Sequence, residues 1–105
     1  MTVQQIQEIL VSIDPQIHHY ECAVDGSNFT VWMEYERVVL PADDEDAEMG
    51  WRFEVDRFTK DEYDPIAEKL EELLMNHPSI TAKPQRVQYD QASGYIRHQF
   101  DCEAI

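Results

Sequence analysis

Basic residues are scarce in this chain, and the resulting imbalance of charge excludes several classes of partner. The 105 residues include 8 lysines and arginines against 22 aspartates and glutamates, which gives a formal net charge of -14. A surface this acidic repels the phosphates of nucleic acids and of anionic membranes, so we expect no tight binding to either. The same charge repels itself within the folded chain, and a basic partner or bound cations would relieve that repulsion.

Cysteines, glycines and long apolar runs are also few. The two cysteines, Cys22 and Cys102, lie far apart in the sequence, so we expect buried free thiols and no disulfide. No run approaches the roughly 20 apolar residues of a membrane span, and no signal peptide is visible, so a cytoplasmic protein is expected. With 3 glycines, 5 prolines and 43% hydrophobic residues, the composition predicts one folded domain over residues 1–105.

Residues 51–76 have the strongest pattern in the chain, that of a strand followed directly by a helix. Apolar and charged residues alternate from Trp51 to Asp56, which predicts a strand with one buried face. The helix begins either at a capping box formed by Thr59 and Glu62 or at Asp64 followed by proline. Its apolar residues lie on one face, at Ile66, Leu70, Leu73 and Leu74.

The other regular segments surround this pair. A capping box from Thr2 and Gln5 begins a helix over residues 2–13, and the Asp25-Gly26 turn predicts a hairpin. The predicted strands outside the central one cover residues 19–24, 29–40, 86–90 and 95–103, with a connection at 79–84. The order α-β-β-β-α-β-β predicts an α+β fold in which an antiparallel or mixed sheet has two helices packed on one face.

Residues 41–50 interrupt these patterns with a run of acidic side chains and no base among them. Like charges repel one another, so we expect a mobile, solvated acidic loop at about residues 41–50. The spacing does not fit a calcium-binding EF-hand, which requires a glycine at its sixth position and a glutamate at its twelfth. The acidic residues are Asp43, Asp44, Glu45, Asp46 and Glu48.

Three further residues are candidates for contacts with a partner. In the strand over residues 29–40, one face is expected to be buried and the other, which carries Trp32, to be polar. The residues expected on the buried face are Phe29, Val31, Met33 and Tyr35. Trp32 is then either covered by a neighbouring loop or placed in a subunit contact, where tryptophan is enriched. Glu68 and Glu72 form a like-charge pair on the polar face of the central helix, which suggests either a partner or a solvated surface.

The sequence contains no motif for catalysis, for a metal or for a cofactor. No serine or cysteine lies in a nucleophile elbow, and no glycine-rich phosphate loop is present. His98 and Cys102 share a strand face, and Cys22 approaches them if the first and last strands pair, but the spacing of a zinc site is missing. We therefore expect a protein that binds or assembles, not an enzyme.

The order of segments from Tyr35 onward resembles that of the small tail-completion, or tail-terminator, proteins of long-tailed bacteriophages and prophages. The stretch before the acidic loop, the strand at 51–60, the helix at 63–74 and the closing hairpin at 88–98 follow that order. The most similar stretches are Val55 to Lys60 and Gly94 to His98. Arg57 stands where the family pattern has an apolar residue.

The resemblance implies a structural virion protein that forms a ring, commonly of six subunits, on the end of the tail tube. Its partners would be copies of itself, the tail-tube protein and the head–tail connector. It would occur in the host cytoplasm during assembly and then in the virion tail, with DNA passing through the ring. The acidic loop would line the lumen, dock a basic patch or remain solvated. The alternative is a small acidic interaction module, such as a DNA mimic or inhibitor, that binds a basic partner.

Overall fold

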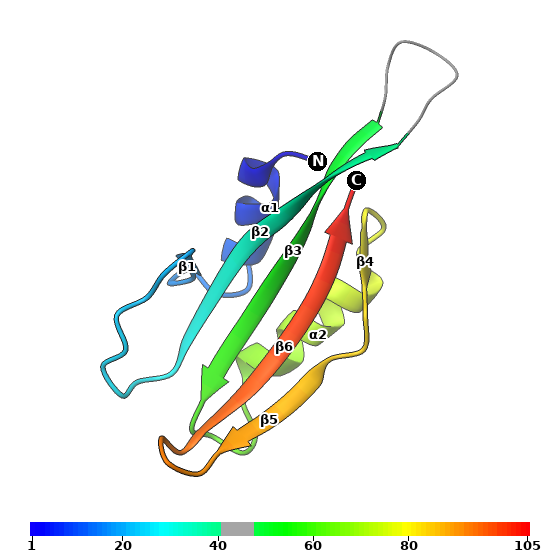
Figure 1. Cartoon of the computed structure of the whole chain (residues 1–105). Helices are drawn as coiled ribbons and strands as arrows, with labels where there is room; N and C mark the ends of the chain where they lie inside the picture. Colours follow the sequence, from blue (N-terminus) through cyan, green and yellow to red (C-terminus); the bar gives the residue numbers. More distant parts are fainter. Residues whose placement is uncertain (41–47) are drawn as a thin grey trace.

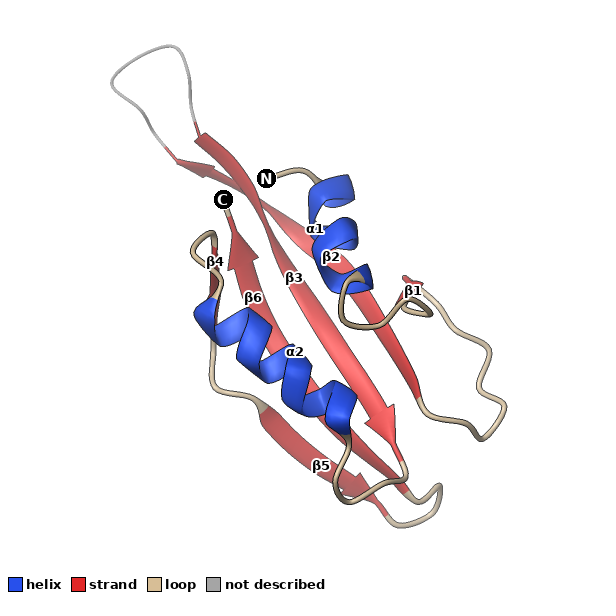
Figure 2. Ribbon diagram, turned by 180° about the vertical axis from the view of Figure 1, so that it is seen from behind, coloured by secondary structure: helices blue, strands red, loops and turns tan. Residues whose placement is uncertain are grey.

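In a computed structural model, which describes residues 1–40 and 48–105, two helices lie on one face of a six-stranded mixed sheet (Figures 1 and 2). The predicted α+β class and element order are confirmed, and β4 is an additional short strand within the predicted connection at 79–84. The elements are α1 (Val3–Val11), β1 (His18–His19), β2 (Phe29–Leu40), β3 (Glu48–Thr59), α2 (Pro65–Asn76), β4 (Ile80–Ala82), β5 (Arg86–Asp90) and β6 (Tyr95–Ala104).

Three long antiparallel strands form the centre of the sheet, in the order β2, β3 and β6. Val55 of β3 is paired with Trp32 of β2 on one side and with Phe100 of β6 on the other. The short β1 runs parallel to the start of β2, while β4 and β5 share the outer edge of β6. One edge of the sheet is therefore formed by β1 and β2, and the opposite edge by β4 and β5 (Figure 1).

Both helices begin where the sequence places a start signal. The Thr2 hydroxyl accepts a hydrogen bond from the Gln5 backbone, and the Gln5 side chain accepts one from the Thr2 backbone, so the predicted capping box is present. Helix α2 starts at Pro65, after Asp64, and not at the alternative box near Thr59, which ends β3. Proline suits this first position because its missing N–H would have no partner inside the helix.

The core lies between the helices and the sheet, and it corrects the faces predicted for β2. Trp32 is 1% exposed; its ring packs edge-on against Phe53, and its indole nitrogen donates to Gln7 of α1. Trp32 therefore belongs to the core of its own chain, which corrects its expected role in a subunit contact. Met33 and Tyr35, expected on the buried face, are exposed. Tryptophan is large enough that its burial decides which face of the strand turns inward.

The predicted hairpin between residues 19–24 and 29–40 is absent. Strand β1 contains only His18 and His19 and runs parallel to β2. The next residue, Tyr20, has a φ of 75°, in the left-handed region. The Tyr20 amide still donates to the Trp32 carbonyl, after which the chain leaves the sheet. β1 lies beside β2 and not β6, so the pairing of first and last strands, on which an approach of Cys22 to His98 and Cys102 was conditional, is absent.

The loop predicted for residues 41–50 is wrong at its last three positions, because Glu48 to Gly50 belong to β3. Asp43, Asp44, Glu45 and Asp46 lie outside the described residues. Gly50 pairs with Val38 of β2 and lies against the chain end, where a Cβ atom would stand 2.0 Å from the Ala104 carbonyl oxygen. Only glycine permits this close approach of β3 to the end of β6.

A buried arginine joins the sheet to both helix ends. Arg57 of β3 is 5% exposed, and its Nε lies 2.7 Å from the carboxylate of Asp64, the residue before α2. A second guanidinium nitrogen lies 3.7 Å from the carboxylate of Asp14, in the turn after α1, and donates to Thr30 of β2 at 3.2 Å. A charge buried in a protein core requires such partners. The Asp64 carboxylate is paired with Arg57 and makes no capping hydrogen bond to α2.

We expect Arg57→Met to destabilise the fold by about 3–5 kcal/mol, because two buried carboxylates lose their counter-ion. The matched control is Arg52→Met on the same strand. Its exposed ion pairs with Glu36 and Glu103 should contribute less than about 1 kcal/mol. Denaturant unfolding of both variants measures the difference. Equal losses would show that the buried cluster adds nothing beyond an exposed pair.

Candidate functional site

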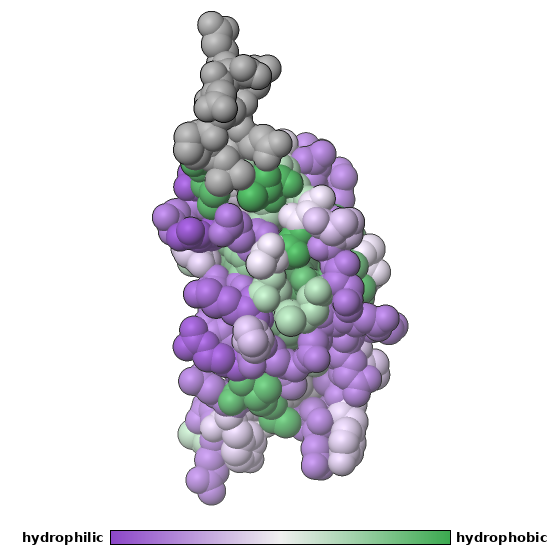
Figure 3. All heavy atoms as spheres, turned by 90° about the vertical axis from the view of Figure 1, so that its right-hand side faces the viewer, coloured by the Kyte–Doolittle hydropathy of each residue, from purple (hydrophilic) through white to green (hydrophobic). Residues whose placement is uncertain are grey.

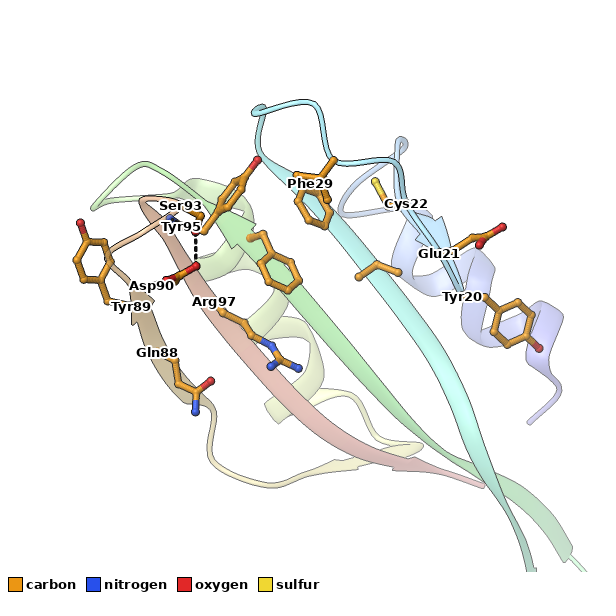
Figure 4. Close-up of a pocket in the computed structure, with 13 residues that line it drawn as sticks. Tyr20, Glu21, Cys22, Phe29, Gln88, Tyr89, Asp90, Ser93, Tyr95 and Arg97 are labelled. Atoms are coloured by element: carbon orange, nitrogen blue, oxygen red, sulfur yellow. Dashed lines mark hydrogen bonds between the residues drawn. The ribbon is translucent and has the colours of Figure 1, made fainter.

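A trough lies on the sheet face opposite the helices. Its volume is about 940 Å³, and it crosses the end of the sheet where β2 starts and β5 ends (Figure 4). We use "trough" for this hollow and "open face" for the sheet face without helices. The lining residues are Tyr20, Glu21, Cys22, Val24, Phe29, Val31, Phe58, Gln88, Tyr89, Asp90, Ser93, Tyr95 and Arg97.

Aromatic rings form the floor of the trough. Phe29 of β2 and Phe58 of β3 are cross-strand partners with stacked rings 4.7 Å apart. Tyr95 of β6 meets both rings edge-on, at 5.7 and 6.1 Å, and its hydroxyl donates to the Ser27 carbonyl. Aromatic pairs in these geometries hold one another in place. The floor is therefore a rigid apolar platform built from the three central strands.

One wall of the trough is the segment from Tyr20 to Val24, which is attached to the sheet edge by a polar contact. The His19 imidazole lies 2.7 Å from the Glu34 carboxylate and stacks on Trp32 at 4.3 Å, and the Tyr20 hydroxyl donates to the same carboxylate. Tyr20 and Val24 remain 57% and 63% exposed. The left-handed backbone of Tyr20 turns the chain away from β1 at this point.

The opposite wall comes from β5 and its turn into β6. Tyr89 is 67% exposed, and the Asp90 carboxylate accepts hydrogen bonds from the Ala92 amide and the Ser93 hydroxyl. The Ser93 hydroxyl is the main cause that lowers the pKa of Asp90. Gly94 completes the turn with a φ of 78°, which favours glycine. Tyr89 pairs with Ile96, on the opposite face of β6 from Tyr95, and its ring points away from the hollow, so this wall presents the Asp90 carboxylate (Figure 4).

The only basic side chain in the described lining is already paired. The Arg97 guanidinium contacts the carboxylates of Asp56 at 3.2 Å and of Glu54 at 3.3 Å, and it lies 5.6 Å from the Phe58 ring centre. Lys60 lies near the trough, 5.0 Å from the Tyr95 ring, but does not line it. The electrostatic character of the trough is therefore acidic and aromatic.

Burial affects the reactivity of both cysteines. Cys22 lines the trough, and burial raises the pKa of its thiol, which opposes formation of the reactive thiolate. Cys102 is buried in the core, where burial raises its pKa to about 12. Within residues 1–40 and 48–105, no three histidine, cysteine or carboxylate groups come together as a metal would require.

Glu68 and Glu72, expected at an interface, lie on the exposed face of α2. They line a smaller hollow of about 260 Å³ together with Glu71 and His98. Burial lowers the pKa of His98, whose ring contacts the Gln85 side chain at 3.1 Å. The two glutamates therefore line the same hollow, whereas Trp32 lies in the core.

Sequence reasoning missed the trough. Its floor comes from β2, β3 and β6. Its walls come from the segment after β1 and from β5 with the following turn, and no local sequence pattern predicts where these segments lie. One signal was present: in β2, apolar residues occupy both faces of the strand, since Phe29, Val31 and Met33 alternate with a buried tryptophan. A strand that is apolar on both faces requires cover on both sides or an exposed apolar surface.

Both outer edges of the sheet carry unpaired strand backbone in the part of the chain that the structure describes. On one side, β1 covers β2 only at Val31 and Trp32, so β2 from Met33 onward has no outer neighbour. On the other side β5 is outermost, and all five of its residues are exposed. Seen from the β4–β5 side, separate apolar areas lie between polar ones (Figure 3).

Comparisons with known proteins do not assign a family. No protein-family model matches the chain, and no curated protein has significant similarity to it. Among the helices of the described residues, none has the length and apolar content needed to cross a membrane.

A pH titration tests the electrostatics of the open face. Burial raises the pKa of Asp56 from 3.8 to about 6, Arg97 opposes the shift, and Glu54 adds to it. The folded chain thus binds this proton more tightly than the unfolded chain. The stability that Asp56 contributes is fully present below about pH 4 and is lost as the pH rises through about 6.

We expect the unfolding free energy of the native chain, relative to Asp56→Asn, to fall between pH 4 and pH 6. Denaturant unfolding across this range measures that difference. Carbon-13 NMR titration of the Asp56 carboxyl provides an independent readout. A midpoint near 4 for that carboxyl, or a difference that does not change with pH, would contradict the assignment.

Proposed function

We propose that this chain is a structural assembly protein of a tailed phage or prophage, a tail-terminator or tail-completion protein. Copies of it close into a ring that caps the tail tube and joins it to the head connector. The observation that carries the proposal is the pair of open strand edges on opposite sides of one sheet. The resemblance of the stretches at residues 55–60 and 94–98 supports the same assignment.

The two edges differ from each other, which favours a ring over a symmetric dimer. The β2 edge carries Met33, Tyr35 and Val39, which are 41%, 47% and 58% exposed. The β5 edge carries Val87 and Tyr89, at 55% and 67%. An interface that joins one edge of a subunit to the other edge of the next is heterologous, and it closes into a ring when the rotation per subunit fits.

Open strand edges are normally protected in proteins that stay monomeric, because they pair with other chains. Here an exposed apolar side chain accompanies the unpaired backbone on each side. Strand pairing between subunits would form hydrogen bonds with the unpaired backbone and would also cover these side chains. Around a passing DNA molecule, the net charge of -14 would keep the ring from holding the phosphates.

The alternative of a DNA mimic receives less support. A mimic needs unpaired carboxylates spaced along one rigid surface. On the open face, the carboxylates of Glu54, Asp56, Asp101 and Glu103 are paired with Arg52, Arg97 or Lys83. These ion pairs neutralise the row that a mimic would present.

The first test combines the purified chain with a tail-tube protein from the same genome. We expect a ring-sized oligomer that binds the ends of tubes and stops their growth. Sedimentation and electron microscopy measure both properties. A chain that stays monomeric at high concentration and never binds tube ends would refute the proposal.

A second test places one lysine on each edge, using two exposed valines. Val39→Lys and Val87→Lys should each abolish ring formation, because a charge at an edge blocks strand pairing. Mixed together, the two variants retain one intact edge each, so they should form a heterodimer and nothing larger. Analytical ultracentrifugation distinguishes these species.

The control for this pair is Tyr63→Lys, a substitution at an 81% exposed residue before α2 and away from both edges. It should assemble as the native chain does. If either edge variant alone still forms a dimer, the interface is isologous and the ring model is wrong.

A further inference from the structure

Strand β5 lies outside the area of the sheet that the two helices cover (Figure 2). Tyr89 pairs with Ile96, and Ile96 pairs with Thr59, a buried residue on the helix side of β3. Tyr89 and Val87, two positions apart on β5, therefore both point to the helix side. They remain 67% and 55% exposed. The layer of helices is thus incomplete over this edge of the sheet.

An acidic wall borders the uncovered side of β5. The hollow of about 260 Å³ beside α2 extends from that helix to Gln85 and to His98 of β6, and no lysine or arginine lines it in the described chain. Its carboxylates belong to Glu62, Asp64, Glu68, Glu71 and Glu72. Among the ion pairs of residues 1–40 and 48–105, only Asp64 of this set takes part, with Arg57. We use "ledge" for this hollow together with Val87 and Tyr89.

The acidic wall costs α2 some stability when the chain is alone. Glu68 and Glu72 are like charges one turn apart, Glu71 lies next to Glu72, and the last turn of the helix has no basic residue. Burial lowers the pKa of His98, so its ring supplies no positive charge at neutral pH. Cations brought by another molecule would relieve this repulsion.

Shape and charge together indicate the occupant. Exposed apolar side chains beside an acidic wall fit a helix with one apolar and one basic face, packed next to α2 on the sheet. The five residues of β5 span about 17 Å, which corresponds to about three helical turns. Neither helix of the described chain has these properties, because α1 contains one glutamate and no basic residue, and α2 forms the acidic wall itself.

We propose that the ledge binds a basic amphipathic helix of a partner protein. Apolar side chains of that helix cover Val87 and Tyr89, and its arginines or lysines pair with Glu68 and Glu71. The bound helix completes the helix layer over β5. This site goes beyond the ring proposal and does not rest on it, because the ring joins strand edges, whereas the ledge uses the helix side of β5 and the face of α2.

The test is a titration of the full chain with a capped helical peptide of about 15 residues, leucine on one face and arginine on the other. Isothermal titration calorimetry measures the affinity, and NMR shifts of Val87, Tyr89 and His98 locate the site. A scrambled peptide of the same composition keeps the charge and loses the apolar face, so it should bind about tenfold more weakly. Repeating the titration with Val39→Lys, which blocks the β2 edge and leaves the ledge intact, removes any effect of assembly.

Variants connect binding to the ledge. Tyr89→Ser should weaken the affinity by about five- to tenfold, as truncation of a contact aromatic does. Glu68→Gln combined with Glu71→Gln should weaken it by about three- to tenfold, because two exposed ion pairs are lost. The matched control combines Glu8→Gln with Glu21→Gln, which removes the same charge at two exposed residues outside the ledge. It should bind within about twofold of the native chain.

Several outcomes would overturn the proposal. Equal binding of the scrambled peptide, or equal weakening by the two double variants, would show attraction by net charge without a defined site. Shifts confined to the open face would place the peptide there. Assembly of copies that Glu68→Gln with Glu71→Gln abolishes, without peptide binding, would make a second copy the occupant. A chain that binds the peptide and never assembles would refute the ring alone, so the two proposals fail independently.

Discussion

The buried guanidinium of Arg57 sets the constraint on which the rest of this fold depends. A charge in the core is tolerated only with close partners, and here the partners are Asp14 in the turn after α1, Asp64 before α2 and Thr30 of β2. Both helices must therefore reach the same face of β3 at one end of the sheet. An apolar side chain at this position would pack as well but would not specify where the helices start and stop.

Because both helices are held on one face, the other face is left without cover. Much of the open face is polar, and its side chains pair across the strands. Arg97 pairs with Asp56, and the Tyr35 hydroxyl donates to Asp101. That hydrogen bond is the main cause that raises the pKa of Tyr35 to about 12. At the far end of the sheet, aromatic residues replace these polar pairs. The trough thus lies where the open face changes from ion pairs to rings.

The sequence predicted the elements better than their surroundings. Periodicity and capping identified α1, α2, β3 and β6, because those signals are local. The prediction from sequence failed for β1. The Asp25-Gly26 turn suggested a hairpin, but the strand ends at His19, before the left-handed backbone of Tyr20. The prediction from sequence also exchanged the buried and exposed faces of β2. A strand with apolar residues on both faces has no alternation of apolar and polar residues that would identify the buried one. The trough could not be predicted, because it depends on how four segments distant in sequence meet.

The net charge of the chain opposes the assembly of copies that we propose. Arg52, Arg57, Lys83 and Arg97 are already in ion pairs, so half of the 8 basic residues are used within the chain. The acidic excess therefore faces outward. Copies that meet edge to edge repel one another, and salt weakens that repulsion. Raising the ionic strength consequently favours assembly of the copies.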